Sequence, residues 1–281
     1  MIVANLIDTN IAHAESYDDS LEKGRISKNI SYVKNLTSFD GITIFTDSCL
    51  HYANQINSRK KVAWIMEPRA YSPETYIFLE KVSSNFDLIL TYDKKLLESF
   101  PDKTVHVPAD GIFLDSESIF CKHEKTKMCS HIYSNKTILS GHKLRHTIAD
   151  LIKEKNLRVD AYGAGAGLPL IKKSDALKNY RFSIAVENNN DQLYITEKIY
   201  DCFATRTVPV YNGTNHVLKN FNPNGILMFD TLEELVGIIE KFTPELYESM
   251  IEAVEENYHL VMKHYSVDDH IAGALKNFFK L

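Results

Sequence analysis

The chain has 281 residues, of which 44% are hydrophobic and 25% are charged, and its formal net charge is −5. These values are ordinary for a soluble globular protein, and the net charge gives no general attraction to nucleic acid or to anionic membranes. The length favours two domains, since a domain typically holds roughly 100–200 residues.

The N-terminal sequence MIVANLIDTNIAHAESYDD contains an apolar run that is too short to span a membrane. It also lacks the basic flank and the small-residue cleavage site of a signal peptide. The four cysteines form no C-x-x-C pair, which favours reduced thiols. They are Cys49, Cys121, Cys129 and Cys202. We therefore expect a cytoplasmic protein without a membrane span.

Strand-like runs alternate with helix-like segments in the first half of the chain. The strands are expected at residues 2–7, 41–46, 62–66, 87–92 and 104–108. Alternation at this spacing is typical of an α/β fold with a parallel sheet and flanking helices. Residues 122–135 are polar and show little periodicity, so the domain boundary is predicted there, between domains 1–128 and 129–281.

The second half continues the same alternation. A helix, a strand, a glycine-rich turn, a further strand and a helix are expected at residues 141–156, 158–162, 163–167, 226–229 and 232–242. Residues 243–281 are almost entirely helix-forming, and we expect them to cover the sheet.

Residues 181–213 of this half read as a β-α-β unit. A strand, a helix and a second strand are predicted at residues 182–186, 194–204 and 208–211. In open α/β sheets a ligand lies beyond the carboxyl ends of the strands, against a helix N-terminus that favours anionic groups. The polar residues in that zone are Glu187, Thr196, Glu197 and Lys198. A lysine there can hold a phosphate, and a carboxylate can accept hydrogen bonds from sugar or ribose hydroxyls.

The same segment resembles the donor-binding motif of the α-1,3/1,4-fucosyltransferases, family 10 of the glycosyltransferases. The family pattern is an apolar strand, F-E-N, a short polar gap, Y-[IV]-T-E-K, then V-P-V and a glycine. The matching residues are Val186, Glu187, Asn188, Tyr194, Ile195, Thr196, Glu197, Lys198, Val208, Pro209, Val210 and Gly213. One departure is Val186, where the family usually has Phe.

The resemblance implies a GT-B fold, in which two Rossmann-like domains face each other across a cleft. The N-terminal domain would bind the acceptor and the C-terminal domain the donor. It further implies an inverting transfer of L-fucose from GDP-fucose to an acceptor hydroxyl, with no cofactor beyond the nucleotide-sugar donor. The donor-binding residues that it implies are Arg145, Tyr162, Gly163, Glu187, Asn188, Tyr194, Thr196, Glu197 and Lys198.

Glu67 follows the predicted strand 62–66 and precedes Pro68, which turns the chain. On the residues alone, a surface carboxylate paired with Arg69 and a general base are equally good interpretations. The resembling family has a glutamate after the corresponding strand that is taken as the general base. Glu67 is the carboxylate of VAWIMEPR that matches it, so the resemblance implies the catalytic role.

Arg145 is expected on the helix 141–156, where an arginine without a ligand would by default face solvent. The resemblance gives an arginine at this place to the donor phosphates, although the neighbouring basic residues His142, Lys143 and His146 stay alternatives. Gly163 begins a weak dinucleotide-binding pattern, which we interpret as backbone that passes close to the donor.

Two Cys-x-His pairs, Cys121 with His123 and Cys129 with His131, suggest zinc, but paired zinc ligands are usually separated by two to four residues. The chain also has no Asp-x-Asp pair to hold a metal-bound diphosphate. We therefore expect catalysis without a protein-bound metal, with cationic side chains and helix N–H groups neutralising the diphosphate.

Two alternatives stay open. The first keeps the fold and the chemistry but uses another nucleotide sugar, or an acceptor such as a protein, a lipid-linked glycan or a modified nucleic-acid base, because residues 1–128 match the family poorly outside VAWIMEPR. The second is a non-catalytic nucleotide-binding module. Eukaryotic members of the family typically begin with a membrane anchor and a stem, so their absence here implies a bacterial or viral protein, or a trimmed form of a longer one.

Overall fold

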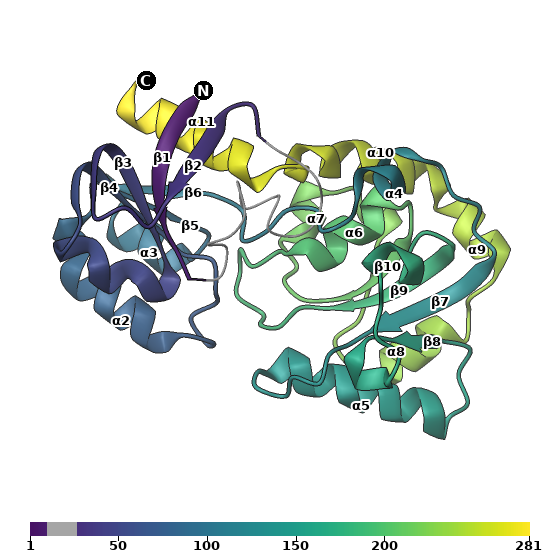
Figure 1. Ribbon diagram of the computed structural model, residues 1–281. Helices are drawn as coiled ribbons and strands as arrows, with labels where there is room; N and C mark the ends of the chain where they lie inside the picture. Colours follow the sequence, from purple (N-terminus) through teal and green to yellow (C-terminus); the bar gives the residue numbers. More distant parts are fainter. Residues whose placement is uncertain (10–26) are drawn as a thin grey trace. The chain divides into compact units, whose positions relative to one another are not determined.

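The computed structural model describes residues 1–9 and 27–281, and it divides the chain into two compact units (Figure 1). Unit 1 contains Met1–Gly111 and Ser266–Leu281, and unit 2 contains Ile112–Tyr265. The sequence-based boundary at residue 128 and the assignment of all C-terminal helices to the second half both differ from this division. The predicted α/β class is confirmed, since each unit is a parallel sheet with helices.

Unit 1 contains a parallel sheet with the strand order β2-β1-β3-β4-β5-β6. The strands are β1 (Ile2–Ile7), β2 (Ile30–Lys34), β3 (Ser38–Thr46), β4 (Asn57–Trp64), β5 (Leu88–Thr91) and β6 (Thr104–His106). The helical segments between them are η1 (Asp47–Asn54), α2 (Pro73–Val82), η2 (Ser83–Asn85) and α3 (Lys94–Ser99). Strand β2 was not predicted, because the interval between the first two expected strands was assigned to helix.

The last helix, α11 (Val267–Phe279), packs on the sheet of unit 1, beside β1 and β2 in Figure 1. Ile271 and Leu275 are fully buried in one cluster with apolar side chains of the strands. At the start of the helix the Tyr32 hydroxyl of β2 donates a hydrogen bond to Asp268 at 2.8 Å. These contacts explain why the end of the chain belongs to unit 1 and not to the second half.

Unit 2 contains a second parallel sheet, with the strand order β11-β10-β9-β7-β8. The strands are β7 (Lys127–Ile132), β8 (Asp160–Tyr162), β9 (Tyr180–Val186), β10 (Val208–Asn212) and β11 (Leu227–Met228). The longer helices are α5 (Ser140–Glu154), α6 (Glu197–Ala204), α8 (Leu232–Ile239) and α10 (Ile251–Val261). The short helical segments are α4 (Ser116–Phe120), η3 (Ala164–Ala166), η4 (Lys173–Ala176), α7 (Val217–Asn220), η5 (Pro223–Gly225), α9 (Pro244–Ser249) and η6 (Met262–His264).

Strand β7 lies inside the polar segment 122–135, where the sequence showed little periodicity and no strand was predicted. The strand pairs with β8 on one side and β9 on the other. Its buried polar side chains find partners inside the unit: Ser130 Oγ donates to Ser183 Oγ at 2.9 Å, and His131 Nε2 lies 2.9 Å from the Arg145 carbonyl oxygen. Polar residues are therefore tolerated in a buried strand because each is hydrogen-bonded.

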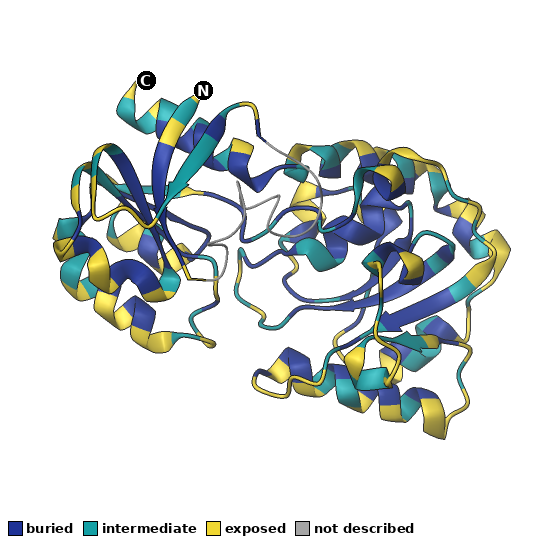
Figure 2. Ribbon diagram, viewed as in Figure 1, coloured by how far each residue is buried: buried dark blue, intermediate teal, exposed yellow. Residues whose placement is uncertain are grey.

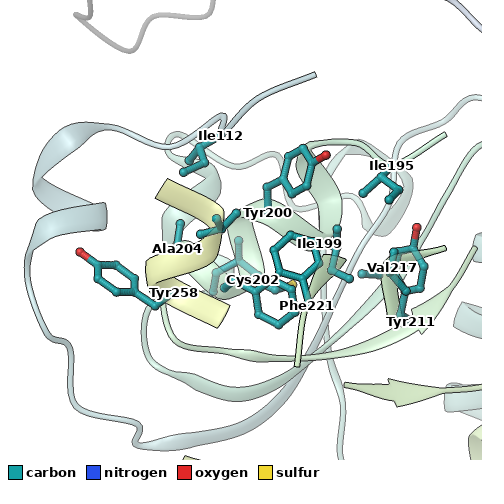
Figure 3. Close-up of a cluster of buried hydrophobic side chains, with 14 of the residues drawn as sticks. Ile112, Ile195, Ile199, Tyr200, Cys202, Ala204, Tyr211, Val217, Phe221 and Tyr258 are labelled. Atoms are coloured by element: carbon teal, nitrogen blue, oxygen red, sulfur yellow. The ribbon is translucent and has the colours of Figure 1, made fainter. Parts of the chain in front are cut away.

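Helices cover both faces of the unit 2 sheet, and Figure 2 shows its long strands β9 and β10 as buried. Side chains alternate along β9, so Phe182 and Ile184 pack with α5 and α8, whereas Ala185 packs with α6 and α10. Figure 3 shows the apolar cluster on the face of the sheet that α6 and α10 cover, in which Ile199 and Cys202 of α6 lie among other apolar side chains. In the described part of the chain, no helix has both the length and the apolar character that crossing a bilayer requires.

Candidate functional site

Glu187 joins the end of β9 to the start of α6. Its side chain is buried, and Oε1 accepts hydrogen bonds from the Thr196 N–H at 3.0 Å and the Tyr211 hydroxyl at 3.2 Å. Its Oε2 accepts the Thr196 hydroxyl at 2.7 Å. Thr196 is in turn the N-cap of the helix, since its hydroxyl accepts the Lys198 N–H at 3.5 Å. The helix therefore begins at Glu197, three residues later than the periodicity predicted.

These contacts also bear on the predicted role of Glu187 in donor binding. Both of its carboxylate oxygens accept hydrogen bonds from the protein. Glu187 and Thr196 are also not among the residues that line the neighbouring cavity. Both residues hold the N-terminus of α6 in place, and their predicted part in donor binding stays a prediction.

The first turn of α5 lies directly against the backbone that follows β9. The Gly141 N–H donates to the Asn188 carbonyl oxygen at 3.2 Å. A Cβ atom at Gly141 would come within 1.8 Å of the Glu187 carbonyl oxygen, so only glycine fits this close approach. One turn later, Arg145 Nε donates to the Gly141 carbonyl oxygen at 3.1 Å, and its guanidinium donates to the Asn188 side-chain oxygen.

Arg145 is the basic residue of α5 that lines the cavity. Of the alternatives that the sequence left open, His142 accepts the Leu139 N–H at the start of the helix and Lys143 is exposed. Burial lowers the pKa of the Arg145 guanidinium while Glu197 and Glu187 raise it, and the group stays charged.

Lys198 and Glu197 form a charged pair at the N-terminus of α6. The Lys198 Nζ donates to the Thr196 hydroxyl at 3.0 Å and lies 3.2 Å from Glu197 Oε1 and 3.4 Å from Glu187 Oε2. Burial lowers the pKa of Lys198, but the two carboxylates reverse the shift and leave it raised. Burial raises the pKa of Glu197, and Lys198 and Lys173 more than compensate, so its pKa is lowered. Both side chains are therefore charged at neutral pH.

A cavity of about 230 Å³ lies beside these charges, at the carboxyl ends of β7 and β9. Its lining combines an apolar floor from the strands with four of the residues that the sequence predicted, Arg145, Gly163, Glu197 and Lys198. The volume is smaller than the roughly 300–1,000 Å³ of typical ligand pockets, so it can enclose only part of a nucleotide sugar.

Gly163 reaches the cavity because the glycine turn after β8 packs on β7. Its φ is +96°, a conformation that other residues rarely adopt, and a Cβ there would lie 2.3 Å from the Tyr133 carbonyl oxygen. Its N–H donates to the Leu168 carbonyl oxygen at 2.8 Å, which closes the turn.

Besides Glu187 and Thr196, three predicted residues lie outside the cavity lining: Tyr162, Asn188 and Tyr194. The Tyr162 hydroxyl is 2.7 Å from the Tyr180 hydroxyl, and Lys127 lies over both rings. Asn188 accepts from Arg145 and donates to the Tyr194 hydroxyl at 3.5 Å. Asn188 thus holds Arg145 in place by a hydrogen bond and is itself held by Tyr194, whereas Tyr162 belongs to a separate cluster.

Two residues of the site were missed by the sequence analysis. Lys173 lines the cavity, with its ammonium 2.7 Å from Asp201 Oδ2 and 3.4 Å from Glu197 Oε1. Asp201 is fully buried on α6. A carboxylate four residues after Glu197 on an otherwise apolar helix face was a usable indication, whereas nothing near Lys173 in the sequence pointed to it.

Glu67 lies in unit 1, three residues after the last residue of β4, and its side chain is exposed. Its carbonyl oxygen accepts the Tyr76 hydroxyl at 2.7 Å. Asp47 Oδ1 accepts the Met66 N–H at 3.0 Å and the Glu67 N–H at 3.3 Å. Burial raises the pKa of Asp47 to about 7 against the opposing effect of these two N–H groups. The backbone that carries Glu67 is thus fixed from two sides.

Arg69, the partner that the alternative interpretation gave to Glu67, forms other ion pairs. Its guanidinium lies 2.9 Å from Glu80 and 3.0 Å from Asp93 and stacks over the Tyr76 ring at 4.2 Å. These contacts tie the turn after β4 to α2 and to the start of α3. The predicted role of Glu67 as a base stays a prediction.

Among residues 1–9 and 27–281, no group of three or more His, Cys, Asp or Glu side chains is placed to hold a metal ion. In the two Cys-x-His pairs, Cys129 and His131 are buried in the sheet, and His131 is bonded to the Arg145 carbonyl. Cys121 is exposed, and His123 Nε2 lies 3.2 Å from the Ser118 carbonyl oxygen.

Residues 122–266, more than half of the 281 residues, match the family model described as Glycosyltransferase family 10 (fucosyltransferase) C-term. The alpha-(1,3)-fucosyltransferase FucT of Helicobacter pylori is 32% identical over 77 residues, which are 26% of this chain and 16% of that protein. The chain thus matches only a small part of this relative's length.

Solved structures also resemble the chain over nearly its whole length, among them the following two. The crystal structure of an alpha1,3-fucosyltransferase with GDP has a TM-score of 0.62 at 18% identity and covers 99% of this chain and 89% of the other. The structure of HepE from Anabaena in complex with UDP-glucose has a TM-score of 0.65 at 10% identity and covers 99% and 100%. At these identities the likeness concerns the fold, and it confirms the predicted GT-B fold.

Proposed function

Because this chain belongs to glycosyltransferase family 10, we propose that it transfers a sugar from a nucleotide-sugar donor to an acceptor hydroxyl. The donor site is the cavity of unit 2. The observation that carries the proposal is that Arg145 and Lys198 line this cavity together, at the carboxyl ends of parallel strands and beside the N-terminus of α6. That is the place where α/β sheets bind phosphate groups.

Two kinds of side chain in the cavity, cationic and acidic, suit different parts of the donor. The guanidinium of Arg145 and the ammonium of Lys198 suit the diphosphate, because both are charged and largely buried. The carboxylate of Glu197, which also lines the cavity, suits hydroxyls of the ribose or the sugar as a hydrogen-bond acceptor. Asn188 and Glu187 fix the cationic residues without reaching the cavity themselves.

We further propose L-fucose as the sugar, GDP-fucose as the donor and inversion at the anomeric carbon. In this step the acceptor oxygen bonds to the anomeric carbon while the bond to the diphosphate breaks and its electron pair passes to the phosphate oxygen. Glu67 takes the acceptor proton. Arg145 and Lys198 stabilise the charge that grows on the leaving diphosphate, which is electrostatic help of a few kcal/mol per group. The support is the family motif at Glu187 to Lys198 and at Glu67.

Nucleotide binding provides the first test. GDP is expected to raise the melting temperature, since a ligand that binds only the folded state stabilises it. Lys198→Ala should weaken GDP binding by about 1.5–3 kcal/mol, the value of a hydrogen bond to a charged group. Lys143→Ala, which removes an exposed lysine of α5, is the matched control and should bind GDP normally. Equal GDP affinity of Lys198→Ala and the wild type would remove Lys198 from the site.

A test of the sugar's identity needs the binding of a second nucleotide to be measured. UDP is the informative comparison, because the structure of HepE holds UDP-glucose. A stronger stabilisation by UDP than by GDP would keep the donor site and overturn fucose. Release of GDP from GDP-fucose in the presence of a panel of glycan, lipid-linked and nucleic-acid acceptors would then identify the acceptor class. A protein that binds GDP but releases none with any acceptor would be a nucleotide-binding module.

A further inference from the structure

Lys173 lies outside the family motif and contacts two acidic residues of α6. Its ammonium is 2.7 Å from Asp201 Oδ2 and 3.4 Å from Glu197 Oε1. Asp201 follows Glu197 by one helical turn, so both carboxylates project from one side of the helix. Lys173 therefore bridges the first turn of the helix that bounds the cavity.

The contact with Asp201 is explained by the fold alone. Asp201 is fully buried, and its Oδ1 accepts the Phe113 N–H at 2.7 Å. A carboxylate removed from water is strongly unfavourable unless a cation pairs with it, and Lys173 is that cation. The Phe113 ring lies 5.6 Å from the same ammonium and adds a cation–π contact.

The contact with Glu197 has no such structural explanation. Glu197 lines the cavity and lies 3.2 Å from the Lys198 ammonium as well as 3.4 Å from that of Lys173. One carboxylate is thus shared by two cations. A carboxylate that pairs with Lys198 competes with any phosphate group for the same ammonium.

We propose that Lys173 is a positioning residue of the donor site, which shares the Glu197 carboxylate with Lys198 and so leaves part of the charge of the Lys198 ammonium available to a diphosphate. The inference rests on the proposed function, and the ligand group that it concerns is the diphosphate. Around the cavity, three cations face three carboxylates. They are Arg145, Lys173 and Lys198 against Glu187, Glu197 and Asp201.

The test is calorimetric titration of GDP and of inorganic pyrophosphate into the wild type, Lys173→Met and the double variant Lys173→Met/Asp201→Asn. The single variant should bind both ligands about tenfold more weakly, the loss expected for one charge-assisted contact. The double variant removes the buried carboxylate that has lost its partner, so its melting temperature should return toward that of the wild type. Its affinity should stay about tenfold reduced, because Glu197 then pairs with Lys198 alone.

Lys172→Met is the matched control, since Lys172 is the exposed neighbour in sequence, and it should bind GDP as the wild type does. A double variant with wild-type affinity would overturn the inference and leave Lys173 as the structural partner of Asp201. Weakened pyrophosphate binding in both Lys173 variants, with no binding of GDP or UDP to the wild type, would end the proposed function but keep the role of Lys173. A wild type that binds neither pyrophosphate nor a nucleotide would overturn both.

Discussion

Glu67 in unit 1 and Glu187 in unit 2 both follow a strand of a parallel sheet, yet their surroundings are opposite. Glu67 exposes its side chain, while Asp47 and Tyr76 hold its backbone. Glu187 is 2% exposed, and both of its carboxylate oxygens accept hydrogen bonds from the protein. In the first case the chain fixes the backbone and presents the carboxylate, whereas in the second the carboxylate itself fixes the chain.

The difference teaches how to interpret a carboxylate at the end of a strand. Sequence position is the same for both residues, and the resembling family has a glutamate at both places. Burial distinguishes the two residues: an exposed carboxylate can meet a substrate, whereas the buried one helps to build the site. We therefore expect substitutions at Glu67 to change turnover and substitutions at Glu187 to change stability.

The largest effect is expected for Glu67→Gln. If Glu67 is the general base, the amide keeps the size of the side chain but cannot accept the proton, so turnover should fall by about 10²–10⁴-fold. GDP affinity and melting temperature should stay at wild-type values, because the side chain is exposed. A folded, GDP-binding Glu67→Gln protein with near-normal turnover would show that Glu67 is not the general base.

Glu187→Gln makes the same chemical change in unit 2 and should lower the stability of the protein. The amide nitrogen cannot accept the bonds that one carboxylate oxygen accepts from Thr196 or Tyr211, and Lys198 loses a buried partner. We expect the free energy of unfolding to fall by about 2–3 kcal/mol. Chemical denaturation of Glu187→Gln and Glu67→Gln side by side measures the contrast. Equal stability of the two variants would contradict it.

Gly141→Ala tests the packing of α5 on the Glu187 backbone. The added Cβ would lie 1.8 Å from the Glu187 carbonyl oxygen, so α5 must shift, at a cost of about 1–3 kcal/mol in the free energy of unfolding. Gly237 in α8 is the control, because a Cβ there meets no atom within 4 Å. Gly237→Ala should stabilise the protein by about 0.5–1 kcal/mol. Destabilisation by both changes to the same extent would point to a general helix effect.

The last prediction is a pH dependence, and it concerns the Asp47 carboxyl beside Glu67. Its pKa is raised by burial to about 7, so between pH 4 and 7 the folded state holds a proton that the unfolded chain has lost. Stability should therefore decline as pH rises through this range. Asp47→Asn keeps an acceptor for the Met66 N–H but cannot ionise, so the difference between the two stability curves isolates the carboxyl. A rise of its pKa from 3.8 to about 7 corresponds to a change of up to about 4 kcal/mol, and parallel curves would assign the pH dependence to other groups.

The sequence predicted those parts of the fold that depend on local patterns. Strand β1 was predicted with its observed bounds, and the β-α-β unit of the motif was placed correctly apart from the start of α6. Strand β7 was missed because its buried polar residues are satisfied by Ser183 and by the Arg145 carbonyl, 53 and 14 residues away in the chain. Such partners cannot be inferred from a window of neighbouring residues.

The prediction of the site had the same limit, because local patterns do not indicate contacts between distant side chains. Four predicted residues line the cavity, because a family motif records which side chains gather there. The observed start of α6 depends on the hydrogen bond between Thr196 and Glu187, and the position of Lys173 depends on its ion pair with the buried Asp201. Both are interactions between side chains, and the resemblance alone did not indicate them.

The packing of α11 on β1 and β2 has a consequence for biosynthesis. Unit 2 is one continuous stretch, Ile112–Tyr265, so all of its residues have been polymerised before α11 is made. Unit 1 must retain an uncovered apolar sheet surface until Ile271 and Leu275 arrive. The part of the protein that leaves the ribosome first is therefore the part that finishes folding last, and during that delay its exposed sheet is a target for chaperones and for aggregation.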